Sequence, residues 1–162
     1  MNESDELLER FRGGPGILAA VIDGVDEDES KFSPAPGKWT IREIAQHLAD
    51  TEFVAGMRLR QIIAENKPNL VLFDQDAWAR ELGYNKLDPF ESLGRFRVLR
   101  EINADMIAGL PVEALEREGY HPERGALTAR AWVERFASHV EKHARQIENI
   151  REAWAARRSS HA

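Results

Sequence analysis

The sequence predicts an all-α protein, a four-helix bundle with long crossover connections. Two observations lead to this prediction. Apolar residues recur at helical spacing in four stretches of the 162-residue chain, and no stretch shows the sustained alternation of apolar and polar residues typical of strands. Two long irregular connections separate these stretches, whereas a simple up-and-down bundle would use short loops.

The first helical stretch extends from about Glu3 to Val25 and contains an internal break. Residues 13–16 read Gly-Gly-Pro-Gly, and both residue types disfavour a helix interior, so we expect a kink there. A phosphate-binding loop is a weaker interpretation, because the lysine and the preceding strand of such a loop are missing. The next segment, DEDESKFSPAPGK, has the composition of a loop.

A capping signal defines the start of the second helix. Thr40 is followed three residues later by Glu43, which is the pattern of a reciprocal capping box. The helix should extend to about Asn66, where Lys-Pro ends it. Its apolar positions form one face: Ile41, Ile44, Ala45, Leu48, Val54, Met57, Ile62 and Ile63.

The third helix should begin after Asp88, a capping residue followed by Pro89 at the first helical position. It is preceded by a mixed segment in which DQDAWAREL forms a short helical turn, and it ends near Gly109. The residues expected to face the core are Leu93, Phe96, Leu99, Ile102, Met106 and Leu110.

A second irregular connection, residues 111–127, leads to the last helix, which Thr128 can cap. The inward face of this helix is Trp132, Phe136, Val140, His143, Ile147, Ile150 and Trp154. No repeat is visible, and the length fits one domain, residues 1–156, followed by a flexible tail, residues 157–162, which contains His161.

Composition excludes several classes of function. A formal net charge of −6 argues against a nucleic-acid-binding protein, which needs a concentrated positive face. No apolar run is long enough to span a membrane, and the acidic start does not resemble a secretory signal, so we expect a cytoplasmic protein. The chain has no cysteine, which excludes thiolate catalysis by the protein itself and leaves His, Asp and Glu as metal ligands.

Three histidines are candidate metal ligands. His139 and His143 are four residues apart, so they project from the same side of the last helix, along or beside its inward face. His47 lies on or near the inward face of the second helix. Three neutral imidazoles without partners would be costly to bury, and joint coordination of one cation removes much of that cost. Nitrogen ligands suit Zn²⁺, Ni²⁺, Fe²⁺ or Cu²⁺ better than Mg²⁺ or Ca²⁺, and three ligands leave a coordination position open.

The residues alone leave alternatives open. Histidines spaced in this way also occur as surface residues or as hydrogen-bonded core pairs. His121 is expected to be a turn residue that could line the mouth of a pocket. Ser138 beside His139 fails as a nucleophile–base pair, because consecutive helical residues point about 100° apart. Asp50 could orient an imidazole or act as a base, but solvated helix surface is the expected role of Asp50 and Glu52. Trp39, Trp132 and Trp154 are most simply core or staple residues.

Two quoted segments carry a family resemblance: PAPGKWTIREIAQHLADTE and HPERGALTARAWVERFASHVEKHARQIENI. With them, residues from about Leu8 to Trp154 resemble the DinB-like superfamily of bacterial four-helix-bundle proteins, which includes the YfiT-like metal-dependent hydrolases. The resemblance implies that His47, His139 and His143 bind a divalent metal, commonly nickel or zinc, with iron also possible. It also implies a thiol-dependent transferase or isomerase that uses bacillithiol, mycothiol or glutathione as cosubstrate, or else a hydrolase or a stress-associated protein. Many members of the superfamily are homodimers.

Three hypotheses follow. The first is an enzyme whose histidine-bound metal activates a thiol or water for transfer to, or hydrolysis of, a small molecule. The second is a non-catalytic metal-bearing protein that binds a small molecule or a partner during stress. The third is a metal-free helical protein whose histidines only pack. No catalytic residue beyond the metal ligands, and no organic cofactor, is assigned from the sequence.

Overall fold

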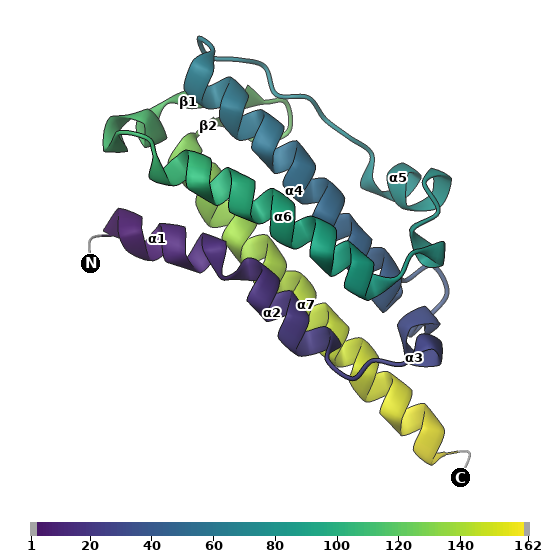
Figure 1. The fold of residues 1–162 in the computed structure, drawn as a ribbon. Helices are drawn as coiled ribbons and strands as arrows, with labels where there is room; N and C mark the ends of the chain where they lie inside the picture. Colours follow the sequence, from purple (N-terminus) through teal and green to yellow (C-terminus); the bar gives the residue numbers. More distant parts are fainter. Residues whose placement is uncertain (1–2, 161–162) are drawn as a thin grey trace.

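Four helical units form a bundle in the computed structural model, which describes residues 3–160 (Figure 1). The units are α1 (Glu3–Arg12) with α2 (Gly14–Ile22), α4 (Ile41–Ala64), α6 (Pro89–Ala108) and α7 (Ala129–Ser159). Helix α4 packs against α6 and α7, while α1 and α2 pack against the same two helices from the opposite side. The predicted all-α, four-helix architecture is therefore confirmed.

One connection has to cross the length of the bundle. Helices α4 and α6 are neighbours that run in the same direction (Figure 1). The chain therefore returns through residues 65–88, which contain the short helix α5 (Gln75–Glu81) and the turn η1 (Tyr84–Lys86). The sequence predicts helical structure at α5, and its N-cap is Asp74, whose carboxylate accepts hydrogen bonds from two backbone amides.

The predicted helix starts are confirmed by their caps. Thr40 Oγ1 accepts from the Glu43 amide at 3.3 Å, and the Glu43 carboxylate accepts from the Thr40 amide at 2.8 Å, which completes the capping box. Asp88 accepts from the amide of Glu91 at 3.0 Å at the start of α6. Thr128 Oγ1 caps α7 by accepting from the amide of residue 131 at 3.1 Å. Each cap satisfies an amide that has no partner inside its helix.

The glycine-rich segment separates α1 from α2, as predicted. Gly13 lies between the two helices, and Pro15 lies in the first turn of α2, where its missing amide is tolerated. Gly14 has a further role, because a Cβ atom there would lie 2.7 Å from Nη1 of Arg100 on α6. A glycine therefore allows α2 to approach α6 closely.

Two segments predicted to be irregular contain regular structure. The loop after α2 includes a short helix, α3 (Glu27–Lys31), capped by the Asp26 carboxylate. The connection after α6 contains the turn η2 (Val112–Glu116) and an antiparallel hairpin of β1 (Glu118–His121) and β2 (Gly125–Thr128). The hairpin was not predicted from the sequence, because four-residue strands are too short to show alternation. Gly125 begins β2 at a positive φ of 77°.

The predicted inward face of α6 needs one correction. Phe96 is fully buried and Leu93 nearly so, but the side chain of Ile102 is 51% exposed. The positions facing the core are instead occupied by Arg100 and Asn103, which are 2% and 3% exposed. Polar residues were counted as solvent-facing in the sequence pattern, and both of these are buried because they bond to Glu52 on α4.

The end of the chain differs in part from the predicted tail. Helix α7 continues to Ser159, beyond the predicted start of a flexible segment at residue 157, while residues 161 and 162, including His161, lie outside the described residues. The division into one domain and a tail stays a prediction. Within residues 3–160, no helix combines the length and apolar character needed to cross a bilayer.

Candidate metal centre

Helices α4 and α7 bring three histidine side chains together. His47 lies on α4, and His139 and His143 lie one turn apart on α7. Nε2 of His139 is 3.2 Å from Nε2 of His47 and 3.1 Å from Nε2 of His143. One ring nitrogen from each of the three lies within 4.8 Å of the others. The convergence expected from the helix faces is thus present.

Burial keeps these imidazoles neutral. The side chains of His47 and His143 are 2% and 8% exposed. Burial, reinforced by the neighbouring charges of His143 and Lys142, lowers the pKa of His47 to about 3. Burial also lowers the pKa of His139 to about 2, with additional contributions from the other two histidines. The neutral form is the one that offers lone pairs to a metal ion.

Two polar side chains near the triad were not predicted as partners. The Nδ1–H of His143 donates to Oε1 of Gln146 at 2.9 Å, which leaves the lone pair on Nε2. The hydroxyl of Thr51, one turn after His47, lies 3.4 Å from both Nδ1 and Nε2 of that ring. A hydrogen-bonded second nitrogen fixes the ring orientation and the tautomer of a metal-binding histidine. The one-turn spacing from each histidine is the signal that could have identified both partners.

Trp39 forms an aromatic wall against the triad. Its ring centroid is 4.8 Å from that of His47 and 6.4 Å from that of His143, and the second pair is stacked. The sequence suggested a core or staple role for this residue, which lies just before the N-cap of α4. It packs against the hydrophobic core as expected, and its position also covers two of the histidines.

The three nitrogens fit a transition-metal ion. With metal–nitrogen bonds of about 2.1 Å, two ligand nitrogens lie about 3.4 Å apart in a tetrahedral site and about 3.0 Å apart in an octahedral one. The two separations that involve His139, 3.1 and 3.2 Å, fall in this range, and all three nitrogens lie within 4.8 Å of one another. In the absence of a metal, a proton on Nε2 of His139 can form a good hydrogen bond with Nε2 of either His47 or His143, but not with both. A metal cation can instead accept a lone pair from each of the three nitrogens. The donor set and its spacing therefore suit such an ion.

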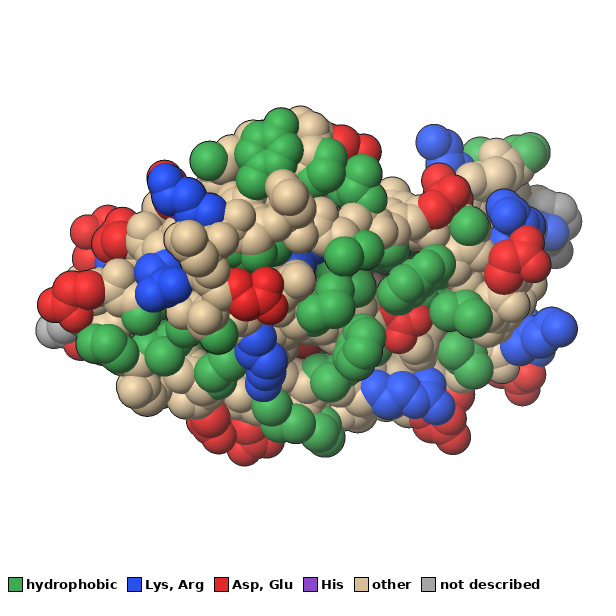
Figure 2. Space-filling view, turned by 90° about the horizontal axis from the view of Figure 1, so that it is seen from above, with side chains coloured by type: hydrophobic (Ala, Val, Ile, Leu, Met, Phe, Trp, Pro, Cys, Tyr) green, Lys and Arg blue, Asp and Glu red, His purple; other side chains and the backbone are tan. Residues whose placement is uncertain are grey.

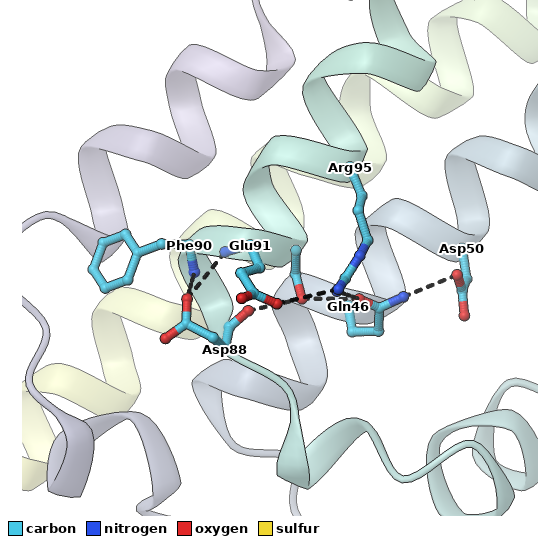
Figure 3. A network of polar contacts seen from close by, with 7 residues as sticks. Gln46, Asp50, Asp88, Phe90, Glu91 and Arg95 are labelled. Atoms are coloured by element: carbon cyan, nitrogen blue, oxygen red, sulfur yellow. Dashed lines mark hydrogen bonds and ion pairs between the residues drawn. The ribbon is translucent and has the colours of Figure 1, made fainter.

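Asp50 is held by partners other than the histidines. Gln46, directly before His47, donates from Nε2 to Asp50 Oδ1 at 3.0 Å, and the hydroxyl of Tyr84 donates to Asp50 Oδ2. Arg95 on α6 donates to Oε1 of the same glutamine at 3.1 Å (Figure 3). This network joins α4 to α6 next to the triad. Asp50 is thus part of the support of α4, and it does not bond to an imidazole within residues 3–160.

Two further sequence expectations can be compared with the structure. Glu52 was expected on solvated surface, which was wrong: its side chain is 1% exposed and its carboxylate lies 2.7 Å from Nη2 of Arg100. Ser138 accepts a hydrogen bond from Arg10 and donates to the carbonyl of residue 134, so it does not pair with His139. The geometric objection to a nucleophile–base pair is therefore supported.

A cavity of about 350 Å³ adjoins His47 and His139. His121, at the end of β1 beside the hairpin turn, also lines this cavity, with a side chain that is 3% exposed. The volume is in the range of small-molecule sites in proteins. A ligand in this cavity would have direct access to two of the three histidines.

Comparison with known proteins finds similar sequences that are named for metal-dependent hydrolysis. A protein of Oceanobacillus iheyensis, named "Putative metal-dependent hydrolase", is 27% identical over 153 residues, covering 93% of this chain and 88% of its own. A protein of the same name from Bacillus cereus is 25% identical over 147 residues, covering 91% and 84%.

Two solved structures share the fold. YfiT from Bacillus subtilis, described as "a probable metal-dependent hydrolase with an unusual four-helix bundle topology", superposes with a TM-score of 0.88 at 20% identity, covering 96% of this chain and 90% of its own. The four-helix bundle protein TT2238 gives a TM-score of 0.65 at 21% identity, covering 90% and 98%. The model of the DinB superfamily matches residues 10–147, most of the bundle and all three histidines, and the chain therefore belongs to that superfamily.

Proposed function

We propose that this protein is a metal-dependent enzyme that binds one divalent transition-metal ion through His47, His139 and His143 and acts on a small molecule. The observation that carries the proposal is the convergence of three neutral ring nitrogens, from the buried His47 and His143 and the half-buried His139, beside a cavity of about 350 Å³. The names of the similar proteins, which describe metal-dependent hydrolases, support the same interpretation.

Zinc or nickel is the proposed ion, with iron as a further candidate. Three nitrogen donors and no thiolate favour these ions over Mg²⁺ and Ca²⁺, which prefer oxygen ligands. When bound, the ion would supply Lewis acidity that activates a nearby water or thiol. The protein's own contribution is to keep the imidazoles neutral, to orient His143 through Gln146, and to exclude water on the side of Trp39.

Two reactions are proposed for this site: hydrolysis of a small molecule, and transfer of a low-molecular-weight thiol to an electrophile. The chain contains no cysteine, so a reacting thiol has to enter as a cosubstrate. The cavity beside His47 and His139 provides the space for it. A non-catalytic metal-bearing binding protein is the alternative, because Asp50 and Glu52, the two carboxylates that follow His47 on α4, have other partners.

We also propose that the protein forms a homodimer and is cytoplasmic. Phe53, Val98 and Ile102 on the adjacent helices α4 and α6 have side chains that are 59%, 56% and 51% exposed. Figure 2 shows hydrophobic side chains gathered in the middle of one face of the molecule. A second copy of the chain is the proposed partner of this face. Analytical ultracentrifugation should give a dimer that Phe53→Asp converts to a monomer, and a monomeric wild type would contradict the proposal.

The absence of cysteine supports the cytoplasmic location.

The metal site is tested by elemental analysis of protein purified without an affinity tag. The wild type should contain about one transition-metal ion per chain, and His139→Ala should contain almost none, because two histidines hold such an ion far less tightly than three. His121→Ala is the matched control, since it removes a buried histidine outside the triad and should retain the metal. Equal metal content in the wild type and His139→Ala would defeat the assignment.

Catalysis is tested separately with metal-loaded protein. Monochlorobimane is incubated with bacillithiol, mycothiol or glutathione, and 4-nitrophenyl esters are supplied as hydrolysis substrates. Turnover that depends on both the metal and one thiol would identify a transferase, and metal-dependent ester cleavage would identify a hydrolase. If the metal is present and neither reaction depends on it, the non-catalytic alternative is favoured.

A further inference from the structure

The cavity beside the histidines carries an arrangement of charge that metal binding alone does not explain. Its wall is formed by α4, the segment before α5, the hairpin turn and α7. Three of these four segments contribute one arginine each: α4 contributes Arg58, the hairpin turn Arg124 and α7 Arg135. Asp74 and Glu123 also line the wall. Three guanidinium groups against two carboxylates is a local positive excess in a chain whose net charge is −6.

The arginines are not neutralised by the neighbouring carboxylates. Within residues 3–160, no salt bridge involves Arg58, Arg124 or Arg135. The carboxylate of Asp74 instead caps α5. Burial lowers the pKa of Arg58, and the positive charges of Arg124 and Arg135 lower it further, while the negative charge of Glu123 acts in the opposite direction. The three guanidinium groups therefore repel one another, and an anion placed among them would relieve that repulsion.

Arg58 is the fixed member of this group. Its side chain is 6% exposed, and its guanidinium lies 5.3 Å from the ring centroid of Trp132 and 5.8 Å from that of Phe73. Nη2 donates to the carbonyl of Val71 at 2.6 Å, while Nε is buried without a hydrogen-bond partner in the described structure. A buried charged donor without a partner is costly. An acceptor that reached Nε from the adjoining cavity would remove this cost.

His121 adds a neutral donor to the same wall. Its Nδ1 accepts from the backbone amide of Glu123 at 3.3 Å, which places the proton on Nε2. Burial lowers the pKa of His121, and the charges of Arg58 and Arg124 lower it further, so the ring stays neutral at physiological pH. The wall therefore offers both charged and neutral hydrogen-bond donors.

We propose that this cavity binds an oxyanion of the substrate, a carboxylate or phosphate group, on Arg58 with Arg124 and Arg135. Arginine is suited to this role because its planar fork of N–H groups matches the oxygens of such anions. The inference rests on the proposed function, because it assigns one end of the substrate to the arginines and leaves the reacting group beside His47 and His139. It predicts that substrates of this protein are anionic small molecules.

The anion site is tested on chelator-treated protein, so that the measurement does not depend on the metal. Isothermal titration at low ionic strength is carried out with malonate, with inorganic phosphate, and with malonamide, the uncharged analogue of malonate. Malonate or phosphate should bind and malonamide should not. Arg58→Met and Arg135→Met should each weaken oxyanion binding by about tenfold or more, as expected for the loss of a charge-assisted hydrogen bond. Arg97→Met, which removes an exposed arginine of α6 outside the cavity, is the matched control and should bind like the wild type.

Arg135 is exposed, so its replacement tests the site even if replacing the buried Arg58 unfolds the chain. Equal binding of malonate and malonamide, or oxyanion affinities in Arg135→Met equal to those in Arg97→Met, would overturn the inference. Its failure is distinguishable from failure of the proposed function. Metal at about one ion per chain without arginine-dependent oxyanion binding would defeat the anion site alone. Oxyanion binding in a protein that never retains metal would defeat the proposed enzyme and leave the anion site intact.

Discussion

Arg100 and Glu52 form an ion pair between α6 and α4, with side chains that are 2% and 1% exposed. The guanidinium of Arg100 also donates to the backbone carbonyl of Phe11 at 2.5 Å and lies 3.9 Å from the centroid of the Phe11 ring. The Glu52 carboxylate accepts from Asn103 at 2.8 Å. Removing one member of a buried pair leaves the other charge without compensation, and this loss is more costly than replacing both members by apolar residues.

Arg100→Met should therefore destabilise the protein by about 3–5 kcal/mol. The double variant Glu52→Leu with Arg100→Met should be closer to the wild type than the single variant is. Urea unfolding followed by circular dichroism at pH 7 measures both. A double variant as unstable as Arg100→Met alone would show that the pair stabilises by its specific contacts and not merely by mutual compensation.

The buried histidines make the stability of the metal-free protein dependent on pH. In the unfolded chain a histidine has a pKa of about 6.5, whereas burial lowers the pKa of His47 to about 3 and that of His139 to about 2 in the fold. Between these values the unfolded chain binds more protons, so the free energy of unfolding falls as the pH falls below about 6.5. The slope per histidine is at most about 1.4 kcal/mol per pH unit.

Urea midpoints of chelator-treated protein from pH 7 to pH 4.5 test this dependence. The wild type should lose stability over this range more steeply than His139→Gln, which removes one of the titrating rings and leaves the carboxylates unchanged. The difference between the two slopes isolates the histidine contribution. Parallel slopes would contradict the assignment of a strongly lowered pKa to His139.

The positions of single side chains could be predicted from the sequence where the helical repeat determines which side of the helix they lie on. His47, His139 and His143 were placed together because each lies on or beside an apolar face. Arg100 and the three cavity arginines were not identified, because a charged residue counts as solvent-facing in a periodic pattern. Their roles depend on partners that are distant in the sequence, such as Glu52 for Arg100.

At the scale of elements, the helix starts were the most predictable features, because a cap is a local signal. The capping box of Thr40 and Glu43 and the cap at Thr128 are present as expected. Helix α3 and the hairpin of β1 and β2 were missed. Their lengths of five and four residues are below what periodicity can detect.

The cap of α4 has a measurable role, because this helix carries His47. Thr40→Ala removes the acceptor for the Glu43 amide and should destabilise the protein by about 1 kcal/mol. Thr40→Ser retains a hydroxyl at the same position and should recover most of the loss. Thermal unfolding of the metal-free variants measures both. Equal destabilisation by alanine and serine would show that the threonine methyl group, and not the hydrogen bond, stabilises this end of the helix.

For the whole molecule, the histidine site joins helices that are not consecutive in the chain. Helix α4 contributes His47, and α7, separated from it by α6 and the hairpin, contributes His139 and His143. The four-helix architecture could be predicted from periodicity, but the pairing of α4 with α7 was implied by the shared need of the histidines for partners and by the family resemblance. Because α4 and α6 run in the same direction, the chain between them returns along the bundle. Part of this returning segment forms a wall of the cavity beside His47 and His139.

Because the three nitrogens converge only in the folded bundle, metal binding should stabilise the whole molecule. At a free metal concentration about 100 times the dissociation constant, the free energy of unfolding should rise by about 2.7 kcal/mol, and a chelator should reverse the rise. Differential scanning calorimetry with increasing Zn²⁺ or Ni²⁺ measures the shift. His139→Ala should show little shift, whereas His121→Ala, with the triad intact, should follow the wild type. A shift of equal size in His139→Ala would place the stabilising ion elsewhere, and no shift in the wild type would show that α4 and α7 are not joined by a metal.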